Sequence, residues 1–178
     1  MSPSMRKQKQ PMTRPRARLS RQLIPLGIVR NDLIQTPIEV ARHLVSYFRP
    51  TGTILEPCKG EGNFLRALPP DTQWCEALEG RDFFAWRQPV DWIITNPPYS
   101  QFRAFHRHAM TVADNIVFLT TINHYWLKAR LRDMRNADFG FREIRLLHTP
   151  STFPSSGFQI GAVYTQRQWH GQMVVSHA

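Results

Sequence analysis

Residues 91–100, DWIITNPPYS, place a short apolar run directly before a stiff polar segment. Trp92, Ile93 and Ile94 favour extended backbone, and the run stops at Asn96, so these residues predict a buried strand. Two adjacent prolines then fix the backbone of the loop that follows. A rigid loop at the end of a core strand is well suited to hold a ligand.

Strand and helix patterns alternate on both sides of this stretch. TPIEVARHLVSYF, residues 36–48, predicts a helix with Thr36 as its cap and Pro37 at its first position. The sequence predicts further strands at 53–55, 72–78 and 115–121, and further helices from Asn63 to the prolines at 69 and 70, at 101–113 and at 125–136. This alternation predicts an α/β fold with a mostly parallel central sheet and helices on both faces.

The end of the chain has a different pattern. FREIRLLHT, residues 141–149, and FQIGAVYTQ, residues 158–166, are consecutive strand patterns with only the loop PSTFPSSG between them. Because no helix separates them, we expect a C-terminal antiparallel hairpin at the edge of the sheet.

The length of 178 residues and the hydrophobic content of 42% predict one folded domain. We assign this domain to residues 31–170, between a basic N-terminal arm at 1–30 and a short tail at 171–178. The arm has eight Lys and Arg residues and no acid, so it carries +8 of the formal net charge of +10. A flexible, solvated tail and a contact with nucleic-acid phosphates both agree with this composition.

The composition also bears on the cellular environment. Cys58 and Cys75 are too few for a metal set or a disulfide framework, and they suit a reducing cytoplasm. No apolar run approaches the length of a membrane span, and residues 1–20 lack the apolar stretch of a secretion signal. We therefore expect a cytoplasmic protein with no membrane partner and no metal site.

The segment EPCKGEGNF, residues 56–64, follows a predicted strand, where open α/β sheets bind ligands. Gly60 and Gly62 leave room for the backbone to approach a ligand, and a helix that begins near Asn63 would offer free amide donors. An ordinary glycine turn explains the same spacing.

An acidic residue strengthens the ligand-binding interpretation. Glu76 lies twenty positions past Glu56, at the end of the second predicted strand, where a carboxylate can accept both hydroxyls of a ribose. Glu79 is the competing choice. In GRDFF, Asp82 can accept from the exocyclic amine of an adenine and Phe83 can pack on its ring, although a solvated acid beside core aromatics is equally compatible with these residues.

The tetrapeptide NPPY, residues 96–99, suits the recognition of a planar amine. The two prolines restrict Asn96, so its side-chain oxygen and the carbonyl of Pro97 can converge on one point and accept two hydrogens. Tyr99 then presents a ring on which a flat base or amide can stack. A simple turn rarely needs these four residues together.

These motifs, in this order, resemble those of the amino methyltransferases, and in particular the DNA adenine-N6 methyltransferases that use S-adenosylmethionine. The resemblance rests on TP at 36–37, EPCKGEGNF, CEALEGRDFF and NPPY, and it spans roughly residues 31–166. It implies a Rossmann-like class I methyltransferase fold. The cofactor-binding residues that it implies are Thr36, Pro37, Glu56, Pro57, Gly60, Gly62, Glu76, Asp82 and Phe83, and the catalytic residues are Asn96, Pro97, Pro98 and Tyr99.

The family resemblance also suggests the substrate. Sequence-specific members usually carry a sizeable target-recognition domain, and few residues follow the last predicted strand here, so we expect relaxed or short-site specificity on single- or double-stranded DNA. An RNA adenine or a protein glutamine presents the same planar amine, and a non-catalytic nucleic-acid-binding module could keep the same fold. Phosphate contacts are expected from the arm and from Arg103, Arg107, Lys128, Arg130, Arg132 and Arg135, although helical arginines are as often just a solvated face.

Overall fold

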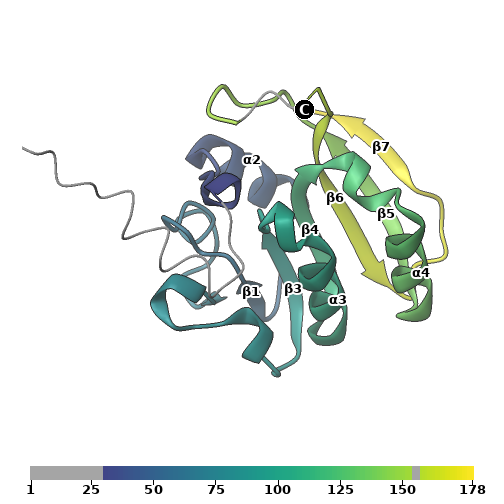
Figure 1. The fold of residues 1–178 in the computed structure, drawn as a ribbon, viewed down its shortest axis with the longest axis horizontal. Coiled ribbons are helices and arrows are strands. Elements are labelled where there is room, and N and C mark those ends of the chain that lie inside the picture. The colour runs from purple at the N-terminus through teal and green to yellow at the C-terminus, as the bar shows by residue number, and fades with distance from the viewer. Residues whose placement is uncertain (1–29, 154–156) are drawn as a thin grey trace, which may run out of the picture.

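The computed structural model describes residues 30–153 and 157–178, so nearly all of the predicted basic arm lies outside the described residues. Within the described part, seven strands form one sheet in the order β2-β1-β3-β4-β6-β5-β7 (Figure 1). The strands are β1 (Ile54–Glu56), β2 (Gln73–Trp74), β3 (Val90–Thr95), β4 (Ala113–Thr121), β5 (Phe139–Leu146), β6 (Ile160–Arg167) and β7 (Val174–His177). The α-helices are α2 (Ile38–Phe48), α3 (Phe102–Val112) and α4 (Lys128–Asn136).

The sheet is mostly parallel, as predicted. β2, β1, β3 and β4 pair in parallel, β6 pairs antiparallel with both β4 and β5, and β7 pairs in parallel with β5. Among the described strands, only β6 therefore runs against the others. The predicted α/β class and the C-terminal antiparallel pair are confirmed.

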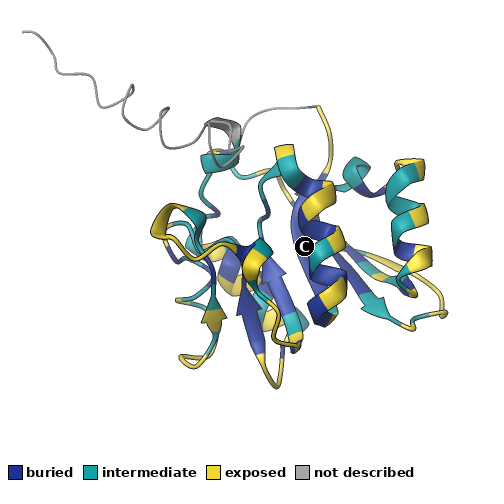
Figure 2. Ribbon diagram, turned by 60° about the horizontal axis from the view of Figure 1, so that its bottom comes forward, coloured by how far each residue is buried: buried dark blue, intermediate teal, exposed yellow. Residues whose placement is uncertain are grey.

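Strand β3, predicted from the apolar run before Asn96, lies at the centre of the core. Ile93 and Ile94 of β3 are fully buried, and because successive side chains of a strand alternate, they enter different apolar clusters. Ile93 packs in the cluster of α3 and α4, whereas Ile94 packs in the cluster of α2. The sheet is thus covered by helices on both faces, and Figure 2 shows buried residues along its central strands and exposed residues along the outer sides of the helices.

Two helix predictions at the front of the chain need correction. Helix α2 begins at Ile38, with Pro37 rather than Thr36 at the capping position and no side-chain cap. The predicted helix after Asn63 is wrong, because residues 60–68 form successive turns. Only a few residues separate Gly62 from the prolines that stop the segment, which is too short to repay the cost of helix nucleation.

The last part of the sheet also differs from the prediction. The β5–β6 hairpin does not form the edge of the sheet, because β7 pairs with β5 beyond it. This strand lies in the segment 171–178, which was predicted to be a short tail. Val174 and Val175 are about half exposed, so the segment lacks the buried apolar alternation that identifies a strand. None of the helices among the described residues is long and apolar enough to cross a membrane.

Candidate active site

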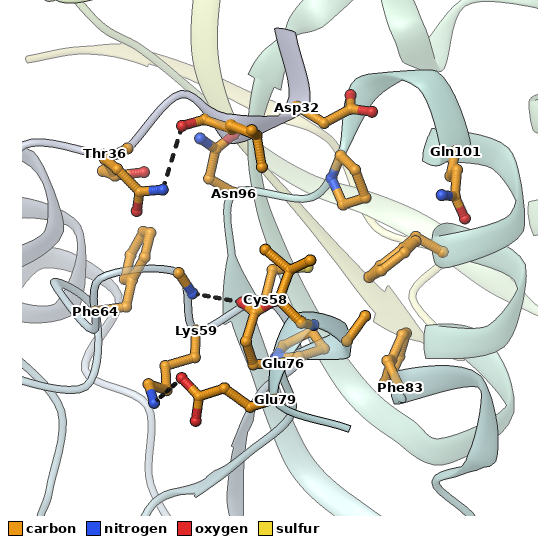
Figure 3. A pocket seen from close by; sticks show the side chains of 18 of the residues that line it. Asp32, Thr36, Cys58, Lys59, Phe64, Glu76, Glu79, Phe83, Asn96 and Gln101 are labelled. Carbon is orange, nitrogen blue, oxygen red and sulfur yellow. Dashed lines mark hydrogen bonds and ion pairs between the residues drawn. The ribbon is translucent and has the colours of Figure 1, made fainter. Parts of the chain in front are cut away.

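A cavity of about 410 Å³ lies at the carboxyl ends of β1, β2 and β3 (Figure 3). This is where ligands bind in open α/β sheets, and the volume is within the usual range for small-molecule sites. Four chain segments form its wall: the irregular segment before α2, the glycine loop after β1, the turns after β2 and the NPPY loop after β3. Its polar and charged lining includes Asp32, Gln35, Thr36, Lys59, Asn63, Glu76, Glu79, Asp82, Asn96 and Gln101.

Glu76 joins two of these walls. One carboxylate oxygen accepts from the Gly60 amide at 2.8 Å, and the other accepts from the Leu78 amide at 3.1 Å. Gly60 has φ +51°, which favours glycine, and a β-carbon there would lie 2.4 Å from the side-chain oxygen of Gln35, so a larger residue would be strained and would displace that side chain. The carboxylate of Glu76 is therefore fixed at the cavity wall by backbone donors of both loops.

The competing acid, Glu79, has a different environment. Its carboxylate forms a 2.5 Å ion pair with Lys59 at the margin of the cavity, and the Glu79 side chain is 45% exposed (Figure 3). The Lys59 ammonium also lies 4.2 Å from the centroid of the Trp74 ring, which Arg81 contacts at 3.7 Å. Glu79 thus already has a cationic partner, whereas Glu76 is held by neutral amides.

Asn96 brings an unsatisfied acceptor to the cavity. Its amide nitrogen donates to the carbonyl of Ile34 at 3.4 Å, while its side-chain oxygen is buried and has no hydrogen-bond partner among the described residues. A buried acceptor without a partner is costly in a folded protein, and among the predicted site residues that line the cavity only Asn96 carries one in the described part of the chain.

The rest of the NPPY loop supports Asn96. Pro97 is buried, and Pro98 lines the cavity. The Tyr99 ring lies edge-on to His124 at 5.1 Å. Burial raises the pKa of Tyr99 well above its usual value, and a contact with the Thr120 hydroxyl opposes this shift only partly, so the phenol is neutral at physiological pH.

A segment in which only Thr36 was predicted as a site residue closes one side of the cavity. We call residues 32–36 the N-terminal strap. The side-chain oxygen of Gln35 accepts from the Glu61 amide at 2.9 Å, and the carbonyl of Thr36 accepts from the Asn63 side chain at 2.7 Å. Asp32 binds Ser100, directly after NPPY. The strap therefore connects the glycine loop to the NPPY loop. Its polar residues, which lie next to the TP pair at 36–37, were the sequence feature from which this contact could have been predicted.

Glu56 lies behind the cavity wall rather than on it. It is fully buried, and one oxygen accepts from the Cys58 amide at 2.9 Å and from the Thr95 hydroxyl at 2.5 Å. The other oxygen is buried without a partner among the described residues. Burial raises the pKa of Glu56 to about 8, opposed by these two hydrogen bonds. Its role in this structure is to hold β1, the glycine loop and β3 together.

Asp82 and Phe83 follow the turn after β2. The Asp82 carboxylate accepts from the Phe84 amide at 2.9 Å and so caps a short 3₁₀ segment. The Phe83 ring is almost fully buried and packs against Phe105 at 5.1 Å and His108 at 4.7 Å. Both residues line the cavity, with Phe83 contributing from the core.

The predicted site residues divide into two groups. Those that line the cavity are Thr36, Pro57, Gly60, Glu76, Asp82, Phe83, Asn96 and Pro98. Those that support its walls from outside the lining are Pro37, Glu56, Gly62, Pro97 and Tyr99. The amide donors expected from a helix after Asn63 are not present as predicted, because residues 60–68 form turns instead of a helix. The amides of Gly60 and Glu61, just before, donate to Glu76 and Gln35.

No family model matches the sequence, and no curated protein matches it. Solved structures do share its architecture. A chain of a type I restriction–modification system superposes with a TM-score of 0.61 at 15% identity, over 90% of this chain and 48% of that one. A proposed class I S-adenosylmethionine-dependent methyltransferase from Listeria monocytogenes gives 0.57 at 14% identity, over 91% and 71%.

The fold is that of the class I methyltransferases. A 23S rRNA methyltransferase shares it with a TM-score of 0.53 at 15% identity, over 76% of this chain and 72% of that one. The chain spans about half the length of the restriction–modification chain. The cavity lies at the topological switch point between β1 and β3, where the order of the strands reverses direction. Open α/β sheets bind their ligands at this position.

Proposed function

We propose that this protein is an S-adenosylmethionine-dependent methyltransferase that methylates the exocyclic N6 of adenine in DNA. The observation that carries the proposal is the buried, unpartnered side-chain oxygen of Asn96 in the NPPY loop, on the wall of the cavity. An amine with two hydrogens supplies the donor that this oxygen lacks. The prolines hold the oxygen in place before the substrate arrives.

The lining residues fit the proposed cofactor. Glu76 would accept the ribose hydroxyls, because its oxygens keep lone pairs beyond those used by Gly60 and Leu78. Asp82 and Phe83 would contact the adenine, and Thr36 and Gly60 would lie near the methionine end. When bound, S-adenosylmethionine supplies an electrophilic methyl group to the site.

The NPPY loop would make the target amine reactive. The N6 lone pair of adenine is delocalised into the ring, so the amine is a poor nucleophile. If Asn96 and the carbonyl of Pro97 each accept one hydrogen, the nitrogen becomes richer in electrons and more pyramidal. Tyr99 would hold the ring by stacking. Rate enhancement then comes from positioning and electrostatics, and the one proton that the methylated amine must lose passes to solvent, so His, Asp or Glu is not required as a general base in this scheme.

DNA is the favoured substrate for two reasons. The net charge of +10 and the basic residues at 1–30 favour a polyanion over a protein. The fold is shared with a chain of a type I restriction–modification system. Because the amine is hidden inside a stacked duplex, the enzyme must flip the base or act on single strands. RNA adenine is the second candidate, since a 23S rRNA methyltransferase also shares the fold.

The test is transfer of a labelled methyl group from S-adenosylmethionine to duplex DNA, single-stranded DNA and RNA in parallel, with cofactor binding measured by calorimetry. Label in DNA supports the proposal, and label in RNA alone replaces its substrate. Cofactor binding without transfer to any nucleic acid points to a protein glutamine. No cofactor binding at millimolar concentration favours a non-catalytic binding module.

A further inference from the structure

Next to the cavity the protein exposes a surface that the proposed chemistry does not use. Trp126 is 45% exposed and Leu127 is 54% exposed, whereas the large apolar side chains of β3, β4 and α3 are mostly buried. Both residues directly precede α4, and Lys128 and Arg130 lie in the first turn of that helix. We call Trp126, Leu127, Lys128 and Arg130 the α4 entry surface.

This surface lies beside the NPPY loop. The 3₁₀ segment Ile122–Tyr125 leads into it from the end of β4, the strand that pairs with β3. The His124 ring of this segment is 5.1 Å from the Tyr99 ring and stacks on the Phe102 ring at 4.9 Å. The Arg130 guanidinium is 5.3 Å from the same Phe102 ring. Continuous ring contacts therefore connect the proposed target site to the α4 entry surface.

The apolar half of the surface is a supported platform. The Trp126 ring packs against Phe141, with 5.0 Å between ring centroids and 38° between planes, yet much of the indole stays exposed. Leu127 extends the exposed apolar area. A ring that is fixed from behind and open in front suits stacking of an unpaired base. Bases inside a duplex are already stacked on each other, so such a platform selects for a single strand.

The charged half suits a phosphate backbone. Helices α3 and α4 carry six Lys and Arg residues and a single acid, Asp133, which Arg103 binds through two hydrogen bonds of 2.7 and 3.1 Å. The other five cations, Arg107, Lys128, Arg130, Arg132 and Arg135, form no ion pair with any described residue. Cations in the first turn of α4 oppose its dipole, and a bound phosphate would relieve this.

We propose that the α4 entry surface binds a single-stranded DNA segment next to the target adenine. One base stacks on Trp126 and Leu127, and the adjoining phosphates contact Lys128 and Arg130. The placement of the target rests on the proposed function, whereas binding to this surface needs no methyl transfer. The substrate is accordingly an unpaired region of DNA rather than a continuous duplex.

The test is the affinity of the full-length protein for a labelled oligonucleotide, measured by fluorescence anisotropy with single-stranded DNA, the same sequence as duplex, and single-stranded RNA. Trp126→Ala should weaken single-stranded DNA binding by about 5- to 100-fold, the range for loss of one stacked base. Duplex binding should change by less than about 2-fold. Trp126→Phe should keep most of the affinity, because it keeps a ring.

A test variant and a matched control variant examine the charged half of the surface. Lys128→Glu should weaken binding of single-stranded DNA and reduce the dependence of affinity on salt, as expected when about one phosphate contact is lost. Arg42→Glu makes the same charge change on the exposed face of α2, across the sheet, and should leave the affinity for single strands closer to wild type. Unchanged S-adenosylmethionine binding controls for folding of each variant.

Two groups of outcomes separate this proposal from the proposed function. The proposal would be overturned if Trp126→Ala weakened the binding of single strands and of duplex equally, or if it weakened neither. Tighter binding of single-stranded RNA than of single-stranded DNA would also overturn it. Single-strand binding that depends on Trp126 and Lys128, without any methyl transfer by the wild type, would leave the surface intact and contradict the proposed function. If Trp126→Ala and Lys128→Glu both transferred methyl groups and bound single-stranded DNA as tightly as the wild type, the proposed function would stand and the role of the α4 entry surface would be contradicted.

Discussion

The Asp32 carboxylate accepts hydrogen bonds from both the amide of Ser100, at 3.1 Å, and its hydroxyl, at 2.5 Å, across 68 residues of sequence. Ser100 immediately follows the NPPY loop, and Asp32 begins the N-terminal strap. The segment that enters the domain from the basic arm is therefore bonded to the loop that holds the proposed target. Asp32 is a positioning residue in this arrangement.

Replacing Asp32 by Ala should loosen the NPPY loop. Hydrogen bonds to a charged group contribute about 1.5–3 kcal/mol when intact, and this pair is partly exposed, so we expect kcat to fall on the order of tenfold. Calorimetric affinity for S-adenosylmethionine should change much less. Asp71→Ala, which removes an exposed acid far from NPPY in sequence, is the control, and an equal loss of kcat in both variants would refute the positioning role.

The two acids at the cavity should behave differently. Glu76→Gln replaces one acceptor oxygen by a donor that faces the amide of Gly60 or Leu78, so the affinity for S-adenosylmethionine should fall by about tenfold or more. Glu79→Gln loses only a partly exposed ion pair with Lys59, of about 0–1 kcal/mol. Calorimetry on both variants decides between them, and the opposite ranking would make Glu79 the ribose ligand.

Tyr99 should act through its ring rather than its hydroxyl. In the proposed function the target base stacks on the Tyr99 ring, so Tyr99→Ala should cost about 1–3 kcal/mol and lower kcat/KM by about 5- to 100-fold. Tyr99→Phe should retain most of the activity, because the hydroxyl is neutral and no hydrogen bond joins it to a described residue. Steady-state kinetics on one oligonucleotide would show this difference, and equal losses would assign the effect to the hydroxyl.

Glu56 should make stability depend on pH. Its pKa is raised from 4.5 to about 8 in the folded protein, so between these values the folded state binds a proton that the unfolded state has released. This contribution to the free energy of unfolding is fully present below about pH 4.5 and is lost as the pH rises through 8. The predicted loss is on the order of a few kcal/mol.

Glu56→Gln tests that prediction, because the amide has the shape of the protonated acid and does not titrate. Denaturant unfolding of both proteins at several pH values should give a stability difference that shifts in favour of Gln as the pH rises from 5 to 8. Other titrating groups, including His106, whose pKa burial lowers to about 3, contribute equally to both curves. Parallel curves would show that Glu56 ionises normally in the folded state.

The sequence predicted the features with strong local causes. The apolar run before Asn96 predicted β3, and the alternation of strands and helices predicted a mostly parallel sheet. The N-terminal strap could not be predicted in the same way, since the bonds of Asp32 to Ser100 and of Gln35 to Glu61 join residues that are distant in sequence. Strand β7 was missed because its exposed valines pack on one neighbour only.

Glu56 was predicted to contact the cofactor, but it is buried behind the cavity wall. A polar residue in a glycine-rich motif suggests a ligand contact, but Thr95 and the Cys58 amide satisfy one of its oxygens inside the wall. Local pattern does not distinguish a carboxylate that faces a cavity from one that faces the core. That distinction depends on the packing of β1 against β3, which only the assembled sheet determines.

The most direct test of adenine-N6 methylation is nucleoside analysis of DNA that has been incubated with S-adenosylmethionine and either the wild type or Asn96→Ala. The wild type should produce N6-methyladenine, and Asn96→Ala should lower the rate by about 10²–10³, as when one preorganised hydrogen-bonding group is lost from an active site. Cofactor affinity should stay close to wild type. Methyl groups on another base, or N6-methyladenine formed equally by both proteins, would contradict the assignment of Asn96 as the acceptor for the target amine.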